Sequence, residues 1–562
     1  MNISTRINKI LLPLLLFSFI TGNSSGVQAA EALNTPDPYT VYCTWIEAPS
    51  TNMVIHFHDY ASNRTESKLE FRRKGRAQWS TKTGSSVNHP YTGDASTVDP
   101  PEPLRLVHTV HLTGLQPDTD YEFRFSESGS LYRFRTMPGN LDDSEIRVAL
   151  GGDLYHIRSE MQNTMRRVAE RDPHFVVIGG DWAYADGLEE RMWKWDHLWE
   201  DWMEYMKDSE GRLIPVVAVI GNHETIGSYK STRDQSPYFY SYFAFPSKGY
   251  GALDFGDYLS VFVLDTEHSN PAIRGNDMQT MWLEDALSRR EDMKHIIASH
   301  HLTAYPSHRD KNAARETRIR QHWHPLFERY DVGLVFENHD HTYHRTHYIR
   351  DGNINPWGVK YLGAGNWGTS TRDVWNPNTT WYLEEAFGTV YKAGIDEDPE
   401  NPHPLTGTPA NPENARHFYL LKVRENDIIV ESVNGNGIVF HSFSHPSRTV
   451  RAEAQKVPTA ETDALTGVPS RFTLFQNYPN PFNRMTVIRY ALPERCNVRI
   501  SIYNLQGTKI KLLTDENKDA GYHYVTWQAD VSSGIYYYTI EANSLENPRT
   551  KFTKRNRMVF LK

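Results

Sequence analysis

The sequence predicts a multidomain protein in which a layered α/β domain is preceded and followed by small β-sandwiches. Between residues 138 and 443, short apolar runs such as IRVAL, HFVVI and VVAVI alternate with helical patterns, which is typical of strands buried on both faces. Residues 31–137 and 471–562 instead carry short alternating runs separated by turn-rich segments, as antiparallel sandwiches do. Residues 444–470 are polar and lack periodicity, so they are predicted to be a linker.

The first thirty residues have the pattern of a signal peptide. Arg6 and Lys9 precede an apolar run at residues 10–20, and small residues follow at 27–30. A membrane anchor is the alternative, but the run is shorter than the ~20 residues that a span needs. We therefore expect residues 1–30 to be removed and the mature chain to be exported without a transmembrane segment.

Charge and cysteine content exclude several classes of function. The formal net charge of −9 argues against a nucleic-acid-binding surface. The only two cysteines, Cys43 and Cys496, fall in different predicted domains, so neither a disulfide framework nor a thiolate metal site is expected.

Helical patterns within the α/β region cover residues 157–170, 188–207 and 277–294. The second pattern places large apolar side chains on one helical face, where core packing is favoured over a substrate platform. These side chains are Met192, Trp195, Trp199, Trp202 and Met206.

Potential metal ligands follow five of the apolar runs. In open α/β sheets, ligands gather beyond the carboxyl ends of the strands, so these residues predict one shared site. The Asp181 carboxylate can bridge two cations, and the Tyr184 phenolate is a hard donor suited to Fe³⁺. The residues are, in order, Asp153, Asp181, Tyr184, Asn222, His223, His300, His339 and His341.

Taken together, the motifs GGD, GDWAY, GNHE and NHDH, with His300, resemble those of the purple acid phosphatases, a branch of the calcineurin-like metallophosphoesterases. The run HTVHLTGLQPDTDYEFRF resembles the fibronectin type III domain that precedes the catalytic unit in that family. The resemblance implies a fibronectin III-like sandwich at residues 31–137 and an αββα metallophosphoesterase sandwich at residues 138–443.

The same resemblance implies a two-metal centre. One ion, Fe³⁺, would be held by Asp153, Tyr184, His341 and the bridging Asp181. The second ion, Fe, Zn or Mn, would be held by Asp181, Asn222, His300 and His339. The family's substrate contacts map onto Asn222 and His223, and His223 would protonate the leaving group. His308 lies where plant members carry a histidine pair and is a further substrate-binding candidate.

This chain departs from the family pattern at two places. Tyr155 stands where the family usually has glycine, and Asn338 replaces the usual glycine of the last motif. Asparagine tolerates left-handed backbone better than most residues, so we expect the turn to be kept.

The C-terminal region has its own resemblance. Two segments resemble the C-terminal sorting domain of type IX secretion cargo. They are the run NYPNPFN at residues 477–483 and the basic, apolar end KRNRMVFLK. The expected partner is the type IX secretion machinery, which would carry the chain through the periplasm and outer membrane to a secreted or cell-surface location. A carbohydrate-binding sandwich is the alternative for residues 471–562.

The function predicted from these features is that of an exported acid phosphatase. It would hydrolyse phosphomonoesters, on small molecules or on exposed surfaces, by attack of a metal-bound hydroxide. A phosphodiesterase or nucleotidase on the same centre is one alternative, and a binding protein with a decayed centre is another.

Overall fold

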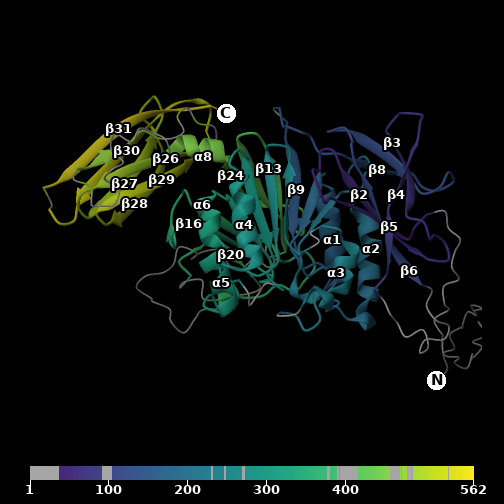
Figure 1. The fold of residues 1–562 in the computed structure, drawn as a ribbon. Helices are drawn as coiled ribbons and strands as arrows, with labels where there is room; N and C mark the ends of the chain where they lie inside the picture. Colours follow the sequence, from purple (N-terminus) through teal and green to yellow (C-terminus); the bar gives the residue numbers. More distant parts are fainter. Residues whose placement is uncertain are drawn as a thin grey trace, which may run out of the picture.

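The structure is a computed structural model, and Figure 1 follows its chain from the N-terminal sandwich through the α/β domain to a C-terminal sandwich. The signal peptide predicted at residues 1–30 lies outside the described residues. The described residues are 37–90, 104–142, 144–229, 232–245, 248–268, 273–375, 380–388, 391–392, 416–455, 469, 471–477, 480, 482, 485–529, 531–547 and 549–561.

The N-terminal domain is the predicted β-sandwich. Its two antiparallel sheets have the strand orders β1-β2-β6-β5 and β4-β3-β7-β8. Alternate side chains of both sheets, such as Phe57 and Phe123, are fully buried between them. The strands are β1 (Thr40–Thr44), β2 (Met53–Tyr60), β3 (Lys68–Arg73), β4 (Ser80–Thr83), β5 (Ser85–Asn88), β6 (Arg105–Leu112), β7 (Asp120–Arg124) and β8 (Tyr132–Arg135).

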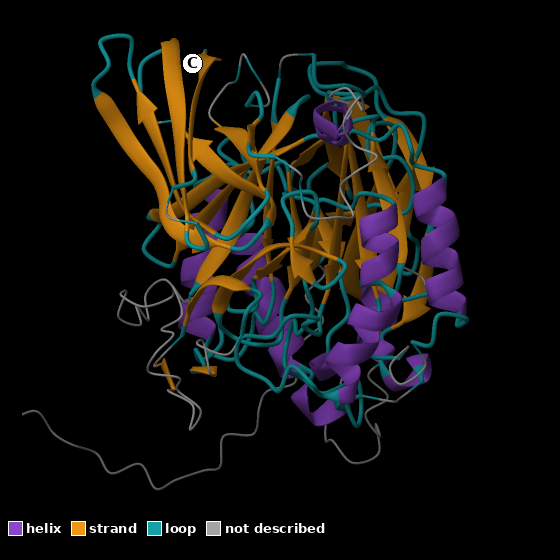
Figure 2. Cartoon of the chain, turned by 90° about the vertical axis from the view of Figure 1, so that its left-hand side faces the viewer, coloured by secondary structure: helices purple, strands orange, loops and turns teal. Residues whose placement is uncertain are grey.

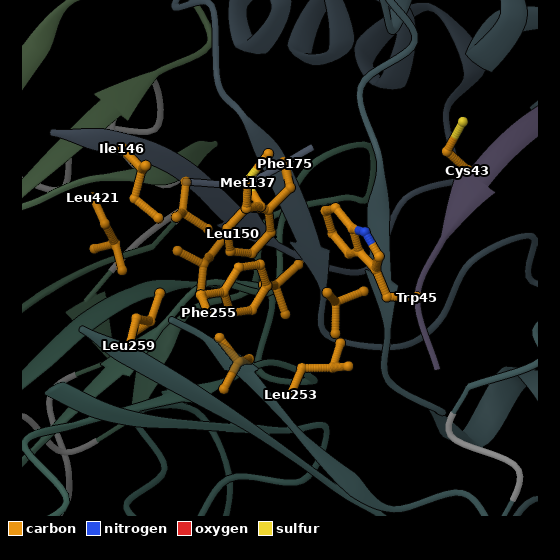
Figure 3. Close-up of a cluster of buried hydrophobic side chains, with 14 of the residues drawn as sticks. Cys43, Trp45, Met137, Ile146, Leu150, Phe175, Leu253, Phe255, Leu259 and Leu421 are labelled. Atoms are coloured by element: carbon orange, nitrogen blue, oxygen red, sulfur yellow. The ribbon is translucent and has the colours of Figure 1, made fainter. Parts of the chain in front are cut away.

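The N-terminal sandwich shares a core with the α/β domain. Trp45 is fully buried and meets the rings of Phe175 and Phe255 edge to face, at centroid distances of 5.7 and 5.6 Å (Figure 3). Tyr42 stacks on Trp199 at 4.1 Å, and its hydroxyl donates a hydrogen bond to the backbone oxygen of Tyr242. Because removal of a buried aromatic ring costs about 3–5 kcal/mol, these contacts fix the sandwich against the α/β domain.

The α/β domain contains two large sheets. The first has the order β11-β10-β9-β22-β23-β24, in which β9, β10 and β11 are parallel and the other strands are antiparallel. Its strands are β9 (Ile146–Gly151), β10 (Phe175–Ile178), β11 (Val216–Ala218), β22 (His417–Val423), β23 (Asp427–Asn434) and β24 (Val439–Pro446).

The second sheet has a parallel centre, β13-β14-β15-β18, with antiparallel strands at both edges. Its strands are β12 (Gly251–Phe255), β13 (Leu259–Leu264), β14 (His295–His300), β15 (Leu334–Glu337), β16 (Tyr343–Arg350), β17 (Asn353–Ile354), β18 (Val359–Gly363) and β20 (Leu383–Phe387). A separate small ladder pairs β19 (Val374–Trp375) with β21 (Tyr391–Lys392).

Helices cover the outer faces of the two sheets (Figure 2). Alternate strand residues separate an inner core from two outer cores. On β14, Ile297 packs into the inner core between the sheets, whereas Ile296 and Ala298 face the outer core beneath the helices. On β15, Leu334 and Phe336 are inner. This alternation decides which side chains reach the site described below.

The three predicted helices are present, with somewhat shorter bounds. Those bounds are α1 (Arg158–Ala169), α2 (Trp193–Tyr205) and α4 (Met278–Ser288). Trp195, Trp199 and Trp202 of α2 are buried in the core as predicted, whereas Trp193 is exposed. The sequence patterns missed several shorter elements. These are α3 (Pro237–Tyr242), α5 (Ala314–His322), α6 (His324–Arg329) and the 3-10 turns η1 (Glu189–Arg191), η2 (Asn222–Glu224) and η3 (Arg233–Gln235).

The predicted linker is wrong in its first part. Residues 444–446 complete β24, and α8 (Arg448–Gln455) follows directly. Arg451 is 2% exposed, donates to the backbone oxygens of Trp357 and Gly358, and pairs with Asp331 at 2.8 Å. The polar sequence of this segment suggested an exposed linker. Its Arg451 is instead buried, because hydrogen bonds and an ion pair satisfy its guanidinium.

The C-terminal domain is a second β-sandwich with its own hydrophobic core. Its sheets have the orders β25-β26-β29 and β28-β27-β30-β31. The strands are β25 (Thr473–Leu474), β26 (Met485–Leu492), β27 (Cys496–Tyr503), β28 (Lys509–Lys518), β29 (Gly521–Gln528), β30 (Gly534–Ser544) and β31 (Lys551–Phe560). Within the described part of the chain, no helix has the length and apolar character that a membrane crossing requires.

Candidate metal centre

The candidate site lies in the loops that follow β9, β10, β11, β14 and β15. Asp153 comes two residues after β9, and Asp181 and Tyr184 follow β10. Asn222 follows β11, and His339 follows β15. The parallel strands of the two sheets therefore deliver these side chains to one edge of the sandwich, as the sequence predicts.

Three predicted ligands form one compact group of donor atoms. The Tyr184 hydroxyl donates to Asp153 Oδ1 at 2.9 Å and lies 3.1 Å from His341 Nε2. His341 Nε2 is in turn 2.9 Å from Asp153 Oδ1. The other ring nitrogen, His341 Nδ1, lies 3.2 Å from the backbone oxygen of Ser370, which orients Nε2 toward the group.

A second group of donor atoms surrounds His301. Its Nε2 lies 3.2 Å from Asp181 Oδ2, 3.1 Å from Asn222 Oδ1 and 3.1 Å from His339 Nδ1. Asp181, His301 and His339 are all buried, and their donor atoms lie close enough together to share one cation. The other ring nitrogen of each histidine makes a hydrogen bond outside this group. His301 Nδ1 contacts the backbone oxygen of Gly179, and His339 Nε2 contacts the Tyr229 hydroxyl.

The structure contradicts the prediction that His300 is a ligand. The neighbouring His301, and not His300, lies within the second group of donor atoms. His300 has the same parity on β14 as Ile296 and Ala298, so its side chain faces the outer core, beside Trp323. There its Nδ1 lies 2.6 Å from the backbone oxygen of Leu302, and its Nε2 is 3.9 Å from Glu337. His301, one residue later, points between the sheets.

Strained backbone holds several of the candidate ligand side chains. Five of the clustered residues have positive φ, which is uncommon outside glycine and concentrates at functional sites. They are Asp153, Asp181, Tyr184, His339 and His341, with φ between 52° and 68°. The left-handed turn of the last motif therefore lies at these histidines, and Asn338 itself is not among the positive-φ residues.

The Asn338 side chain instead links strands, since its amide donates to the backbone oxygen of His300. Gly180 has a positive φ of 95°, and a Cβ there would lie 2.7 Å from His301 Nδ1. The close approach of the Gly180 backbone to the His301 ring thus excludes any side chain at position 180.

The electrostatics of the clusters favour a bound cation. Burial alone would raise the pKa of Asp181, but the nearby His301 and His223 hold it below its usual value. Burial would lower the pKa of His301, but the Asp181 carboxylate raises it to about 10. In the protein without metal, a proton on His301 therefore supplies positive charge beside Asp181, a role that a cation would take over.

The directions of the pKa shifts of Tyr184 and His339 fit their candidacy as metal ligands. Burial and the Asp153 carboxylate raise the pKa of Tyr184 well above its usual range, so only a cation would convert the phenol to a phenolate. Burial and Arg309 lower the pKa of His339, which keeps its imidazole neutral. Asp181 Oδ2 is buried and its near neighbour is the His301 ring nitrogen at 3.2 Å, so a cation that displaces the His301 proton would find this oxygen available.

His223 stands beside the clusters at the more exposed side of the site. Its ring stacks on Tyr184 at 4.3 Å, and its Nδ1 hydrogen-bonds to Asp186 Oδ1. Its Nε2 lies 3.9 Å from Asp181 Oδ2. The Asp186 carboxylate thus orients the imidazole and leaves Nε2 directed toward the site.

His308 does not join either group of donor atoms. Its Nδ1 lies 2.7 Å from the backbone oxygen of Asp373, and its backbone N–H donates to Asp340 Oδ2. The side chain instead lines a neighbouring pocket.

Sequence reasoning missed two residues that organise the site. Glu224 is buried and accepts from the backbone N–H groups of Asp181, Trp182 and Gly221, which ties the β10 loop to the β11 loop. Tyr229 contacts both His339 and Asn222. The glutamate of GNHE was visible in the motif, but nothing in the sequence marks Tyr229.

Family models match three segments of the chain. Residues 38–136 match the purple acid phosphatase N-terminal domain, and residues 146–343 match the calcineurin-like phosphoesterases. Residues 476–554 match the secretion system C-terminal sorting domain.

Curated relatives and a solved structure are also similar to parts of this chain. An uncharacterized protein of Mycobacterium tuberculosis is 29% identical over 282 residues, 43% of this chain and 51% of the relative. Purple acid phosphatase 23 of Arabidopsis thaliana is 26% identical over 47% of this chain and 62% of the relative. The chain therefore spans about half to three fifths of the length of these relatives.

The structure of a purple acid phosphatase from yellow lupin seeds is similar in fold. Its TM-score is 0.54 and its identity 18%, over 72% of this chain and 73% of the lupin chain.

Proposed function

The chain belongs to the purple acid phosphatase family of calcineurin-like phosphoesterases, and from this premise we propose that it is a two-metal phosphomonoesterase. The observation that carries the proposal is the pair of adjoining donor groups, one around Tyr184 and one around His301. Phenolate, carboxylate, amide and imidazole donors in this combination suit one trivalent and one divalent ion.

The distances between donor atoms divide the candidate ligands into two sets, one for each ion. Asp153, Tyr184 and His341 would hold Fe³⁺, and Asn222, His301 and His339 would hold the second ion, Fe, Zn or Mn. Asp181 would bridge them. When bound, the ions would supply Lewis-acid stabilisation of the charge that develops on the phosphate.

The remaining steps belong to side chains of this chain. Asn222 and His223 would contact the phosphate, the role that the family resemblance implies for them. With Nδ1 hydrogen-bonded to Asp186, His223 can donate the proton on Nε2 to the leaving-group oxygen as the ester bond breaks. Glu224 keeps the two ligand-bearing loops in register while this happens.

The test is metal analysis combined with two model substrates. The full chain loaded with iron and a second metal should bind two ions and release phosphate from p-nitrophenyl phosphate. Asp181→Asn should lose at least one ion and most of this activity, because it removes the proposed bridge.

The same assay separates the alternatives. Faster hydrolysis of bis(p-nitrophenyl) phosphate than of the monoester would instead favour a phosphodiesterase. Two bound ions without activity on either substrate would favour a binding protein with a decayed centre.

We further propose that residues 471–562 direct export, which rests on the match to the sorting domain. This sandwich has a core of its own, separate from the cores of the α/β domain. Deleting residues 471–562 should leave phosphatase activity intact and retain the protein inside the envelope. Normal secretion of the truncated protein, measured by fractionation, would refute the sorting role.

A further inference from the structure

A pocket of about 370 Å³ adjoins the loop that carries His339 and His341. This volume is within the usual range for small-molecule sites, roughly 300–1,000 Å³. The pocket lies at the start of α5, and its lining residues are His308, Arg309, Asp310, Ala313, Arg315, Glu316 and Asp373.

Three hydrogen bonds and a ring contact tie the pocket wall to the metal centre. The backbone N–H of His308 donates to Asp340 Oδ2, and Arg309 Nη2 donates to the backbone oxygen of His339 at 3.1 Å. The Arg315 guanidinium lies 3.9 Å from the centroid of the Tyr229 ring, whose hydroxyl contacts His339 Nε2 at 2.9 Å. A ligand in the pocket would therefore lie next to the proposed phosphate site.

Arg315 is held in place without its charge being neutralised. Among the described residues, no carboxylate lies within ion-pair distance of its guanidinium, which packs on the face of Tyr229. Its charge reaches the neighbouring Glu316 carboxyl group only at longer range. A guanidinium packed on a ring keeps its N–H donors available, and its planar geometry suits a phosphate group.

Glu316 supplies a second, independent sign of a ligand. The residue is 1% exposed, and neither carboxyl oxygen has a hydrogen-bond partner. Leaving a buried polar group unpaired is costly, so its presence in a pocket wall points to a hydrogen-bond partner that arrives with the ligand. A hydroxyl group would donate to either oxygen.

We propose that this pocket binds the leaving-group side of a sugar or polyol bisphosphate, with Arg315 binding the second phosphate and Glu316 accepting a hydrogen bond from a hydroxyl group. The proposal rests on the phosphatase function proposed above and narrows its substrate class. None of the described lining residues is Phe, Tyr or Trp, so the pocket offers a nucleobase no large aromatic ring to stack on.

The experiment compares fructose 1,6-bisphosphate with fructose 6-phosphate, which differ by the second phosphate. For the metal-loaded full chain, kcat/KM for phosphate release should favour the bisphosphate by roughly tenfold, the size expected for one charge-assisted contact. In Arg315→Ala the ratio should approach one, and Arg315→Lys should keep part of it. Arg318→Ala removes the same charge from the same helix outside the pocket and should leave the ratio unchanged.

A binding measurement separates this inference from the proposed function. The full chain stripped of metal by chelation should still bind fructose 1,6-bisphosphate more tightly than fructose 6-phosphate by calorimetry, and Arg315→Ala should abolish the difference. Equal binding and equal kcat/KM for the two sugars in the wild type would overturn the inference, even where p-nitrophenyl phosphate is hydrolysed. A preference in binding without any hydrolysis would support the pocket and refute the phosphatase.

Discussion

His301 Nε2 lies 3.2 Å from Asp181 Oδ2 in the interior between the two sheets. His301 directly follows β14 of the second sheet and Asp181 follows β10 of the first sheet, so the pair joins the carboxyl ends of the two sheets. With Asn222 and His339 at 3.1 Å from the same nitrogen, His301 is the centre of the second donor group.

The first prediction follows from the opposite directions of His300 and His301. His301→Ala should remove one metal ion per chain and lower turnover by at least about a hundredfold, because it deletes a direct ligand. His300→Leu should keep both ions, since that ring lies in the outer core beside Trp323. The measurement is metal content by mass spectrometry together with phosphate release.

The neighbouring variant is the matched control, because both changes remove one imidazole from the same strand end. Loss of a metal ion from His300→Leu, with normal metal content in His301→Ala, would reverse the assignment.

The sequence predicted the layered fold and most of the site because both depend on local patterns. Each candidate ligand follows an apolar strand, and the carboxyl ends of parallel strands meet at one edge. The choice between His300 and His301 could not be made in this way. Every residue of β14 is buried, so the sequence contains no polar alternation to reveal which positions face between the sheets.

Contacts distant in sequence explain the other omissions. Tyr229 reaches His339 across 110 residues, and Arg451 is buried by partners about 94 residues away. A single sequence carries no signal for such pairs, whereas the tryptophan stripe of α2 was predictable from its spacing alone.

The second prediction concerns Asp186, whose carboxylate positions the His223 ring by a hydrogen bond to His223 Nδ1. Asp186→Asn should lower kcat for fructose 6-phosphate by roughly tenfold and for p-nitrophenyl phosphate much less, because nitrophenolate leaves without needing a proton. Steady-state kinetics with the two substrates measures this difference.

Asp254→Asn is the control, since Asp254 pairs with Arg290 in the same domain and lies outside the site. An equal loss on both substrates in Asp186→Asn would mean that the carboxylate supports the fold and not the proton transfer.

The third prediction is that acid weakens the packing between the N-terminal sandwich and the α/β domain. Burial lowers the pKa of His56 and of His89 to about 3, and burial followed by the nearby His89 lowers that of His58 well below its usual value. His58 packs here against the rings of Trp199 and Tyr242.

Because these imidazoles take up protons more readily in the unfolded chain, stability is complete above about pH 6.5 and falls as the pH drops toward the lowered pKa values. At pH 5 the loss should be about 2 kcal/mol for each fully buried imidazole. Thermal unfolding at pH 7 and pH 5 should therefore show a falling midpoint.

His58→Gln keeps a polar end for the Tyr42 hydroxyl, which lies 3.2 Å from His58 Nε2, but does not titrate. Its midpoint should fall less between the two pH values than that of the wild type. His523→Gln, in the C-terminal sandwich, should behave as the wild type does. An identical acid shift in His58→Gln would exclude His58 as a source of the effect.

The last prediction uses colour to test the first donor group. The Tyr184 hydroxyl lies 2.9 Å from Asp153 Oδ1 and 3.1 Å from His341 Nε2, and its raised pKa keeps it protonated until a cation binds. Donation from the phenolate into Fe³⁺ would give the iron-loaded protein a visible absorption band that carboxylate and imidazole ligands do not give. Tyr184→Phe should lose this band but, with Asp153, Asp181 and His341 retained, should keep more activity than His301→Ala.

Tyr155→Phe is the control, because the Tyr155 hydroxyl contacts His197, and this variant should keep the band. An iron-loaded wild type that is colourless when oxidised, or a band that survives in Tyr184→Phe, would remove Tyr184 from the proposed ligands.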